Sequence, residues 1–499
     1  MLFRSEKTKK NNTIKIIVLA ISLIFYNLSI VLIRELKDLD EIWNFNFANN
    51  IANGLIPYKD FNMVTMPFLP MIISVFLKIF GQEVIVMRVL CVLMITYIEI
   101  MLLCILEKLK VKDYIKYLSL IFICYINKAY ITIDYNYFIL AIVLTIINIE
   151  ISQYIKNKKI IYFDKKVDFI IGLLAGFCVV TKQSTGAIIA IITIFYKSIE
   201  IRSKSDFIEF IKAFFTRLLG MFIPIFCILA YIWYTGAFRD FISYCILGIK
   251  TFCNYKPYTD LIKSSNLSIK ILSILVPVIL ISCLGMYIIK NKKIFIILFG
   301  YALASMVVIY PIADNIHFLI GIFPSFIILI FLIDKLINKI LRNDKIIYFI
   351  GNFLKIGIVL FSILLFLKSG NIYINSNKNY ELKHFRYIIM DENYIKSIKE
   401  IEEYIDLSEK KVYILDATAA LYMIPIDRYN KNYDLFLIGN LGKDGEEGQI
   451  KNIKKDTEKV YLIMNDKNRR NWQNPERVRK YIIKNKQKID EIGVFDVYE

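Results

Sequence analysis

Long apolar segments alternate with short polar ones along most of the chain, from about residue 13 to residue 367. A helix needs roughly 20 apolar residues to cross the ~30 Å hydrocarbon core of a bilayer. The pattern therefore predicts a mainly α-helical polytopic membrane protein. Eleven crossings are expected, near residues 13–33, 84–106, 114–127, 136–154, 167–181, 184–199, 213–235, 267–289, 293–311, 315–333 and 345–367. The first is interpreted as an uncleaved span, because it is too long for a signal peptide and no small-residue cleavage site follows it.

One apolar segment, Pro67 to Phe80, is too short to be a typical crossing. It has about 14 residues and carries two prolines, Pro67 and Pro70, near its start. Segments of this length more often lie in the membrane interface. We therefore expect this segment to lie along the membrane within the first loop, residues 34–83.

The region after residue 369 differs in composition from the apolar part of the chain. It is charged and turn-rich, so we expect residues 1–369 to form a transmembrane domain and residues 370–499 a separate α/β domain. The hydrophobic periodicity predicts half of a doubly wound fold. Its expected elements are helices at 391–405 and 475–485, strands at 411–416, 460–464 and 493–498, and an apolar segment at 434–438.

Composition and charge support the membrane assignment and orient the chain. The sequence is 57% hydrophobic and 14% aromatic, with a mean hydropathy of +0.52, which excludes a soluble globular enzyme. Lys and Arg cluster in alternate loops, at 7–10, 108–116, 156–166, 197–204, 290–293 and 335–345. Such loops face the cytoplasm, so the N-terminus is expected inside and the C-terminal domain outside. The net charge of +19 then reflects loops that face anionic lipid, and there is no nucleic-acid signal.

With this topology, one group of polar residues gathers at the outer face. Ionisable groups at membrane depth cost about 2.5 to 3.5 kcal/mol on insertion scales, so their joint placement predicts a polar cavity. Singly, each has a simpler explanation: Asp134 as a helix N-cap, Asp38 as an interfacial anchor, Lys182 as a snorkelling side chain, or His317 as a buried ring. The group comprises Asp38, Asp40, Glu41, Tyr58, Asp60, Arg88, Asp134, Lys182, Gln183, Arg239, Asp314 and His317.

Other chemistries have weaker support in the sequence. No metal site is expected, because the chain has only two histidines, His317 and His384, and no carboxylates at ligand spacing. A divalent metal stays possible, and no cofactor is expected. Cys245 and Cys253 share an outer loop and could pair. The glycine-rich segment at 439–448 lacks the order of a nucleotide-binding loop, so it is expected to cap the outer cavity or help hold an acceptor.

The first loop carries a family resemblance. The pattern DEIWNFNFANNIANGLIPYKDF followed by PFLP resembles the first outer loop of type C glycosyltransferases, and is most similar to the protein O-mannosyltransferase and aminoarabinose-transferase-like branch. The resemblance is strong over residues 34–90, topological to about residue 367 and weaker beyond. It implies a GT-C fold with a catalytic site at the outer face. It also implies that the first loop folds into two juxtamembrane helices, at 41–53 and 67–80, as the charge pattern favours.

The resemblance also implies roles for individual residues. Asp40 and Glu41 match the acidic pair of that family, whose aspartate is the expected catalytic carboxylate, and Asp134 matches its second acidic position. Arg88 resembles an arginine that opens the second crossing. Many relatives carry Lys or His before the proline of the short helix, whereas this chain has Thr65-Met66-Pro67. The donor phosphate is therefore assigned to Lys182, with Gln183, Arg88 and His317 as weaker choices; Tyr58 and Asp60 are taken as substrate-binding.

These observations predict an integral membrane glycosyltransferase of the plasma membrane. It would move a sugar from a polyprenyl-phosphate donor to a saccharide, lipid or protein acceptor, with Asp40 as general base. Two other classes remain open: a transporter or flippase for a lipid-linked saccharide, and a polysaccharide polymerase or ligase. A transporter would be expected to show inverted repeats and broken midplane helices, and neither is evident in the sequence.

Overall fold

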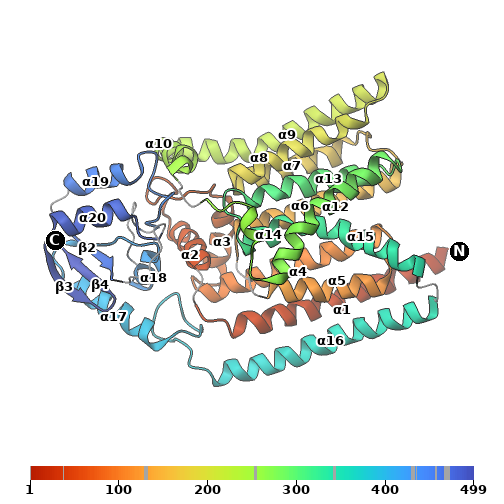
Figure 1. Ribbon diagram of the computed structural model, residues 1–499. Coiled ribbons are helices and arrows are strands. Elements are labelled where there is room, and N and C mark those ends of the chain that lie inside the picture. Colours follow the sequence, from red (N-terminus) through yellow and green to blue (C-terminus); the bar gives the residue numbers. More distant parts are fainter. Residues whose placement is uncertain are drawn as a thin grey trace.

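The structure is a computed structural model that describes residues 2–36, 39–128, 133–251, 255–340, 344–426, 428, 433, 435–455, 458–465 and 473–499. Two residues singled out above, Asp38 and Cys253, lie outside this range. The apolar helices run side by side as a bundle, with the N-terminus at one end and the C-terminal domain at the other (Figure 1). The helices of the bundle are α1 (Leu2–Leu32), α4 (Val84–Lys108), α5 (Asp113–Asn127), α6 (Tyr135–Asn157), α7 (Lys165–Thr181), α8 (Gln183–Phe195), α9 (Lys204–Tyr234), α12 (Leu267–Ile288), α13 (Ile294–Ser305), α14 (Asn315–Gly321), α15 (Phe323–Ile340) and α16 (Asp344–Asn375).

Every predicted span coincides with one of these helices or with two consecutive helical segments. Fewer of these helices qualify as membrane crossings when helix length and composition are the only criteria. Within the described residues, six helices are long and apolar enough to cross a membrane, or seven if α14 and α15, which are bent by 57°, are one broken span. The helix α16 continues to Asn375, beyond Ser369–Gly370, where the composition changes. The predicted number of eleven crossings stays a prediction.

The first loop forms the two predicted helices. They are α2 (Leu39–Ala52) and α3 (Phe68–Phe80), which pack against each other, and α3 also packs against α4. The loop and the start of α4 contact the C-terminal region as well. The indole of Trp43 donates to the carbonyl of Ala417 at 2.9 Å, and Val84 N, at the start of α4, donates to the carbonyl of His384 at 2.9 Å. These contacts hold the first loop and the C-terminal domain at the same end of the bundle.

Short segments connect the longer helices. At the end that carries the C-terminal domain, Phe238 to Thr251 forms a continuous run of helical turns whose central part is π-helical. The short elements are η1 (Tyr196–Glu200), α10 (Phe238–Phe241), η2 (Ile242–Leu247), η3 (Gly248–Thr251), α11 (Thr259–Ile262) and η4 (Met306–Ile309).

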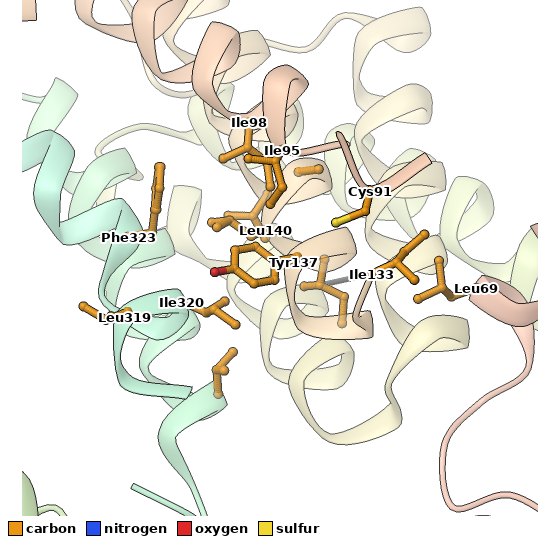
Figure 2. Packing of buried hydrophobic residues seen from close by; sticks show 14 of the residues in the cluster. Leu69, Cys91, Ile95, Ile98, Ile133, Tyr137, Leu140, Leu319, Ile320 and Phe323 are labelled. Carbon is orange, nitrogen blue, oxygen red and sulfur yellow. The ribbon is translucent and has the colours of Figure 1, made fainter. Parts of the chain in front are cut away.

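Buried apolar side chains fix the packing of α4, α6 and α14. Tyr137 of α6 lies between Ile95 and Ile98 of α4 and Ile320 of α14 (Figure 2). Phe323, at the start of α15, extends this cluster. Because closely packed side chains of this kind have little freedom to shift, the N-terminal turns of α6 and α14 are held in a defined relative position.

The pair α7 and α9 meets through glycines. A Cβ on Gly172 would lie 2.1 Å from the carbonyl oxygen of Arg217, and one on Gly220 would lie 2.3 Å from the carbonyl oxygen of Phe169. A side chain at either position would collide with backbone, so these glycines allow the two helices to approach closely.

A buried network of charges joins α6, α7, η1 and α9. Arg217 contacts Glu150 at 2.8 Å and Asp168 at 2.7 Å, and Lys197 contacts Asp168 at 3.3 Å. All four side chains are at most 5% exposed. Two cations face two carboxylates, which offsets much of the cost of removing these charges from water. The sequence analysis did not anticipate this network.

The C-terminal domain is α/β, as predicted, but its sheet is mixed. The strands are β1 (Lys411–Ile414), β2 (Lys459–Met464), β3 (Lys488–Ile492) and β4 (Phe495–Tyr498), in the order β1-β2-β4-β3. Only β1 and β2 are parallel; β4 is antiparallel to β2 and β3. The helices and turns around the sheet are α17 (Glu392–Leu407), α18 (Ala419–Met423), η5 (Ile424–Ile426), α19 (Gly445–Lys455) and α20 (Glu476–Asn485).

The prediction of half a doubly wound domain was therefore wrong for the last two strands. Strand β3 was not predicted, because KIDEI is almost entirely exposed and lacks a buried face. Only Gly493 and Val494 separate it from β4, and Gly493 has a φ of +55°. Such a two-residue connection makes a hairpin, which requires antiparallel pairing.

Candidate active site

The acidic start of α2 lies at the end of the bundle that carries the C-terminal domain. Asp40 and Glu41 stand in the first turn of this helix, where carboxylates interact favourably with the positive end of the helix dipole. The two side chains have different surroundings. Glu41 is buried, whereas Asp40 is half-buried.

Glu41 is engaged by Arg88, which projects from the first turns of α4. The Arg88 Nε and Nη2 atoms donate to the two carboxylate oxygens at 2.8 and 2.9 Å, and Nη1 donates to the carbonyl of Arg34 at 2.7 Å. This is the bidentate geometry that gives arginine its strongest ion pairs. The structure thus pairs Glu41 and Arg88 with each other. The arrangement suits positioning of the first loop better than the roles of catalytic and phosphate-binding residue expected from the sequence.

Tyr58 and Asp60 stabilise the fold of the loop between α2 and α3. The Tyr58 side chain is fully buried, its hydroxyl donates to the carbonyl of Thr65, and its ring lies edge-on to Phe241. An Asp60 carboxylate oxygen accepts from Ile56 N at 2.7 Å. These contacts give Tyr58 and Asp60 of the GLIPYKD sequence a structural role within the loop. Tyr58 has no exposed surface in this structure, and its expected substrate-binding role stays a prediction.

Asp134 caps helix α6. Its carboxylate accepts from Asn136 N at 2.5 Å, which satisfies one of the free N–H groups at the start of the helix. The carboxylate is buried, and burial raises its pKa, although the charges of Lys182 and His317 act in the opposite direction. The capping role considered from the sequence is therefore correct. The Asp134 carboxylate caps the helix and also interacts electrostatically with Lys182 and His317.

Lys182 occupies the break between α7 and α8. Its ammonium donates to the side-chain oxygen of Asn136 at 3.0 Å and lies 4.7 Å from the centre of the Tyr135 ring. Burial lowers the pKa of Lys182 to about 8, opposed by the carboxylates of Asp134, Asp40 and Asp314. The ammonium thus contacts the start of α6, and the charges of Asp40 on α2 and Asp314 before α14 act on its pKa from two other elements.

Asp314 and His317 come from the start of α14. Asp314 caps this helix by accepting from His317 N at 2.9 Å, and its carboxylate also contacts His317 Nδ1 at 2.8 Å. Burial raises the pKa of Asp314, but the contacts with His317 outweigh it, and Lys256 adds to them, so the pKa is lowered. The His317 side chain is 22% exposed, so part of it stays accessible.

Gln183 supports the neighbourhood of Lys182. Its amide nitrogen donates to the carbonyl of Val64 at 3.1 Å and to that of Cys245 at 2.7 Å. It thus joins the first loop to η2. Cys245 itself is a free, buried thiol. Gln183 thus holds two backbone segments together, and the phosphate contact expected for it stays a prediction.

The structure therefore divides the residues predicted from the sequence into two groups. One surrounds Lys182 with charged groups that act on one another, and we call it the Lys182 cluster. The other, made of Glu41, Arg88, Gln183, Tyr58 and Asp60, supports the segments that carry the cluster. The Lys182 cluster comprises Asp40, Asp134, Lys182, Asp314 and His317.

Two members of the neighbourhood, Tyr135 and Asn136, were missed in the sequence. They follow Asp134 directly, and their contacts with Lys182 depend on the packing of α6 against α7. The polar sequence TIDYNYF at the start of an apolar segment was the available signal. Among the described residues, no group of three or more His, Cys, Asp and Glu side chains has an arrangement that could hold a metal ion.

Comparisons with known proteins find similarity in structure but not in sequence. No protein-family model and no curated protein matches the sequence. Among solved structures, the chain is similar to the crystal structure of the Archaeoglobus fulgidus oligosaccharyltransferase in complex with Zn and sulfate. The identity is 10%, the match covers 80% of this chain and 60% of the other, and the TM-score is 0.41. The chain thus spans about three fifths of the length of that protein, and a likeness at this level identifies neither a family nor an activity.

Proposed function

We propose that this protein is a membrane glycosyltransferase of the GT-C type, which moves a sugar from a polyprenyl-phosphate donor to an acceptor at the outer face of the plasma membrane. The observation that carries the proposal is the Lys182 cluster. A lysine is held among three carboxylates and a histidine at one end of a bundle of apolar helices. Such an arrangement supplies both a base and a cation beside the hydrocarbon core.

The reaction needs both kinds of group. The acceptor hydroxyl must lose a proton as its oxygen bonds to the anomeric carbon, and we assign that proton to the Asp40 carboxylate. The bond from the anomeric carbon to the phosphate oxygen breaks at the same time, and the polyprenyl phosphate leaves with the electron pair. Lys182 would neutralise the charge that develops on this phosphate. Asp134 and Asp314 would keep Lys182 protonated at neutral pH, and His317 would contact the donor.

An apolar groove beside the Lys182 cluster suits the lipid part of such a donor. It has a volume of 390 Å³ and lies between α3, α4, α6 and α7. Its wall includes Phe76 of α3, Leu90 of α4 and Ile133, the residue before Asp134. A polyprenyl tail in this groove would bring its phosphate to the start of α6, so the groove supports a lipid-linked donor rather than a soluble one.

The decisive experiment measures transfer from a labelled polyprenyl-phosphate sugar by the purified protein, with envelope extract as the acceptor source. We expect Asp40→Asn to reduce the rate by about 10²-fold or more, since it removes the base and changes the side chain little. Lys182→Met should reduce it similarly by removing the cation. The matched controls are Asp260→Asn and Lys263→Met, which replace exposed residues of the same types near α11. Wild-type rates for Asp40→Asn and Lys182→Met would refute the assignment of these roles.

A further inference from the structure

A second polar cavity lies away from the Lys182 cluster, where the helical turns at 238–251 meet the C-terminal domain. Its volume is 670 Å³. One wall comes from the segment between Arg239 and Leu247, and the other from the segment between Leu441 and Lys455. Its lining is therefore formed jointly by the helical bundle and the C-terminal domain.

A glycine sets the width of this junction. Gly442 has a φ of +75°, and a Cβ there would lie 3.2 Å from Ser243 Oγ and 3.2 Å from the Tyr244 ring. The neighbouring Lys443 N donates to Ser243 Oγ at 3.2 Å. This gives the glycine-rich segment at 439–448 a structural role, because it lets the loop approach η2 while leaving a cavity beside it.

The cavity carries an excess of positive charge. Four cationic side chains, Arg239, Lys443, Lys451 and Lys455, line it with two carboxylates, Asp240 and Asp444. Lys451 and Lys455 are four residues apart on α19 and so share one face of the helix. Within the described part of the chain, none of the four cations has an ion-pair partner.

Neutral polar groups accompany these charges. Asn452 is exposed on the wall, and Gln449 and Tyr244 lie buried behind it, with the Gln449 amide donating to the carbonyl of Leu441 at 3.2 Å. Amides, hydroxyls and an aromatic ring are the groups that recognise sugar hydroxyls and ring faces, whereas lysine and arginine recognise phosphate or carboxylate. The mixture fits a saccharide that carries an anionic group.

The wall of this cavity is connected to the Lys182 cluster. The carbonyl of Cys245, next to Tyr244 on η2, accepts a hydrogen bond from Gln183, the residue after Lys182. A saccharide bound between η2 and α19 would therefore contact a segment that is bonded directly to the candidate site.

We propose that this cavity is a binding site for an anionic saccharide, the acceptor or the growing end of the acceptor. The identification of this saccharide as the acceptor rests on the proposed function. Binding is a separate property that needs neither a donor nor transfer, so its failure can be distinguished from failure of the glycosyltransferase assignment.

Isothermal titration calorimetry on the full-length protein in detergent tests the proposal, with glucose 6-phosphate, glucuronate, glucose and inorganic phosphate as probes. We expect at least one of the two anionic sugars to bind at least tenfold more tightly than both glucose and inorganic phosphate, and its affinity to fall as salt is raised. Comparing glucose 6-phosphate with glucuronate shows whether the cavity prefers a phosphate or a carboxylate group. If neither anionic sugar binds more tightly than glucose or inorganic phosphate, the proposal is wrong.

Charge reversals locate the binding. The double variant Lys451→Glu/Lys455→Glu should weaken binding of the preferred sugar at least tenfold, and Arg239→Glu, on the opposite wall, should weaken it independently. The matched control is Lys454→Glu, on the same helix but over the Tyr481 ring instead of the cavity. Asp260→Asn, an exposed position outside both sites, should bind the sugar like the wild type. Unchanged affinity in both the double variant and Arg239→Glu would overturn the proposal.

Discussion

Arg88 and Glu41 form a bidentate ion pair in which both side chains are only 3% exposed. The pair joins the first turns of α4 to the first turn of α2, and the same guanidinium also holds the carbonyl of Arg34. Asp40 is the residue before Glu41, so the Arg88–Glu41 ion pair also fixes the position of the Asp40 backbone. The acidic pair thus combines a positioning residue with the proposed base.

Breaking this pair on one side should destabilise the protein more than removing it altogether. Arg88→Met leaves a buried carboxylate without its partner, which costs about 3 to 5 kcal/mol. The double variant Arg88→Met/Glu41→Leu removes both charges, so it should be more stable than Arg88→Met alone. Thermal unfolding of the purified variants measures the difference. A double variant that is less stable than both single variants would contradict a paired role.

The charge of Lys182 should control donor affinity in a pH-dependent way. Its pKa is lowered to about 8, so the side chain is charged below this pH and neutral above it. The KM for the polyprenyl-phosphate sugar should therefore rise as the pH increases through about 8. Lys182→Arg keeps its charge at all these pH values, so its KM should stay flat from pH 7 to 9. Parallel curves for the two proteins would show that another group titrates.

Asp134 offers a way to separate capping from electrostatics. Asn is as good an N-cap as Asp, so Asp134→Asn should preserve the start of α6, whereas Asp134→Ala should cost about 1 kcal/mol of stability. Asp134→Asn also removes a charge that raises the pKa of Lys182. The KM increase should then begin at lower pH than in the wild type. An unshifted profile would mean that Asp134 acts only as a cap.

The buried charge network predicts a strong effect far from the Lys182 cluster. Arg217→Met leaves Glu150 and Asp168 with Lys197 as their only cationic contact among the described residues, and should cost about 3 to 5 kcal/mol. The comparison variant is Lys212→Met, an exposed lysine on the same helix, which should change stability by less than about 0.5 kcal/mol. Unfolding midpoints in detergent check both. Equal midpoints for the two variants would show that the network contributes little.

The orientation of the chain can be tested by labelling. In a variant without native cysteines, Lys484→Cys in the C-terminal domain should react with an impermeant thiol reagent in intact cells. Lys290→Cys, in a lysine-rich loop at the end of α12, should react only after lysis. The opposite pattern would invert the topology and place the Lys182 cluster in the cytoplasm.

The periodicity of apolar residues by itself predicted most of the helices. The helices at the predicted spans and the elements α17, β1, β2, α20 and β4 were predicted close to their observed positions, whereas the two helices of the first loop were expected from the family resemblance. Each depends on local regularities, which are visible in sequence: a long apolar segment for a span, and alternation bounded by turn residues for a strand. Strand β3 was missed because KIDEI has almost no buried face to produce such a pattern.

The sequence also determined which residue types gather between the apolar segments, but only the tertiary structure decided their partners. Arg88 and Lys182 are both cations at the ends of apolar segments, and the sequence assigned both to a phosphate. In the structure, Arg88 forms an ion pair with Glu41. Lys182 contacts Asn136 of α6, and carboxylates from the starts of α2, α6 and α14 act on its charge. The Tyr58 side chain, expected at a substrate site, is likewise fully buried. Ion pairing and burial join residues that are far apart in the chain, so they follow from how helices pack, which no local pattern encodes.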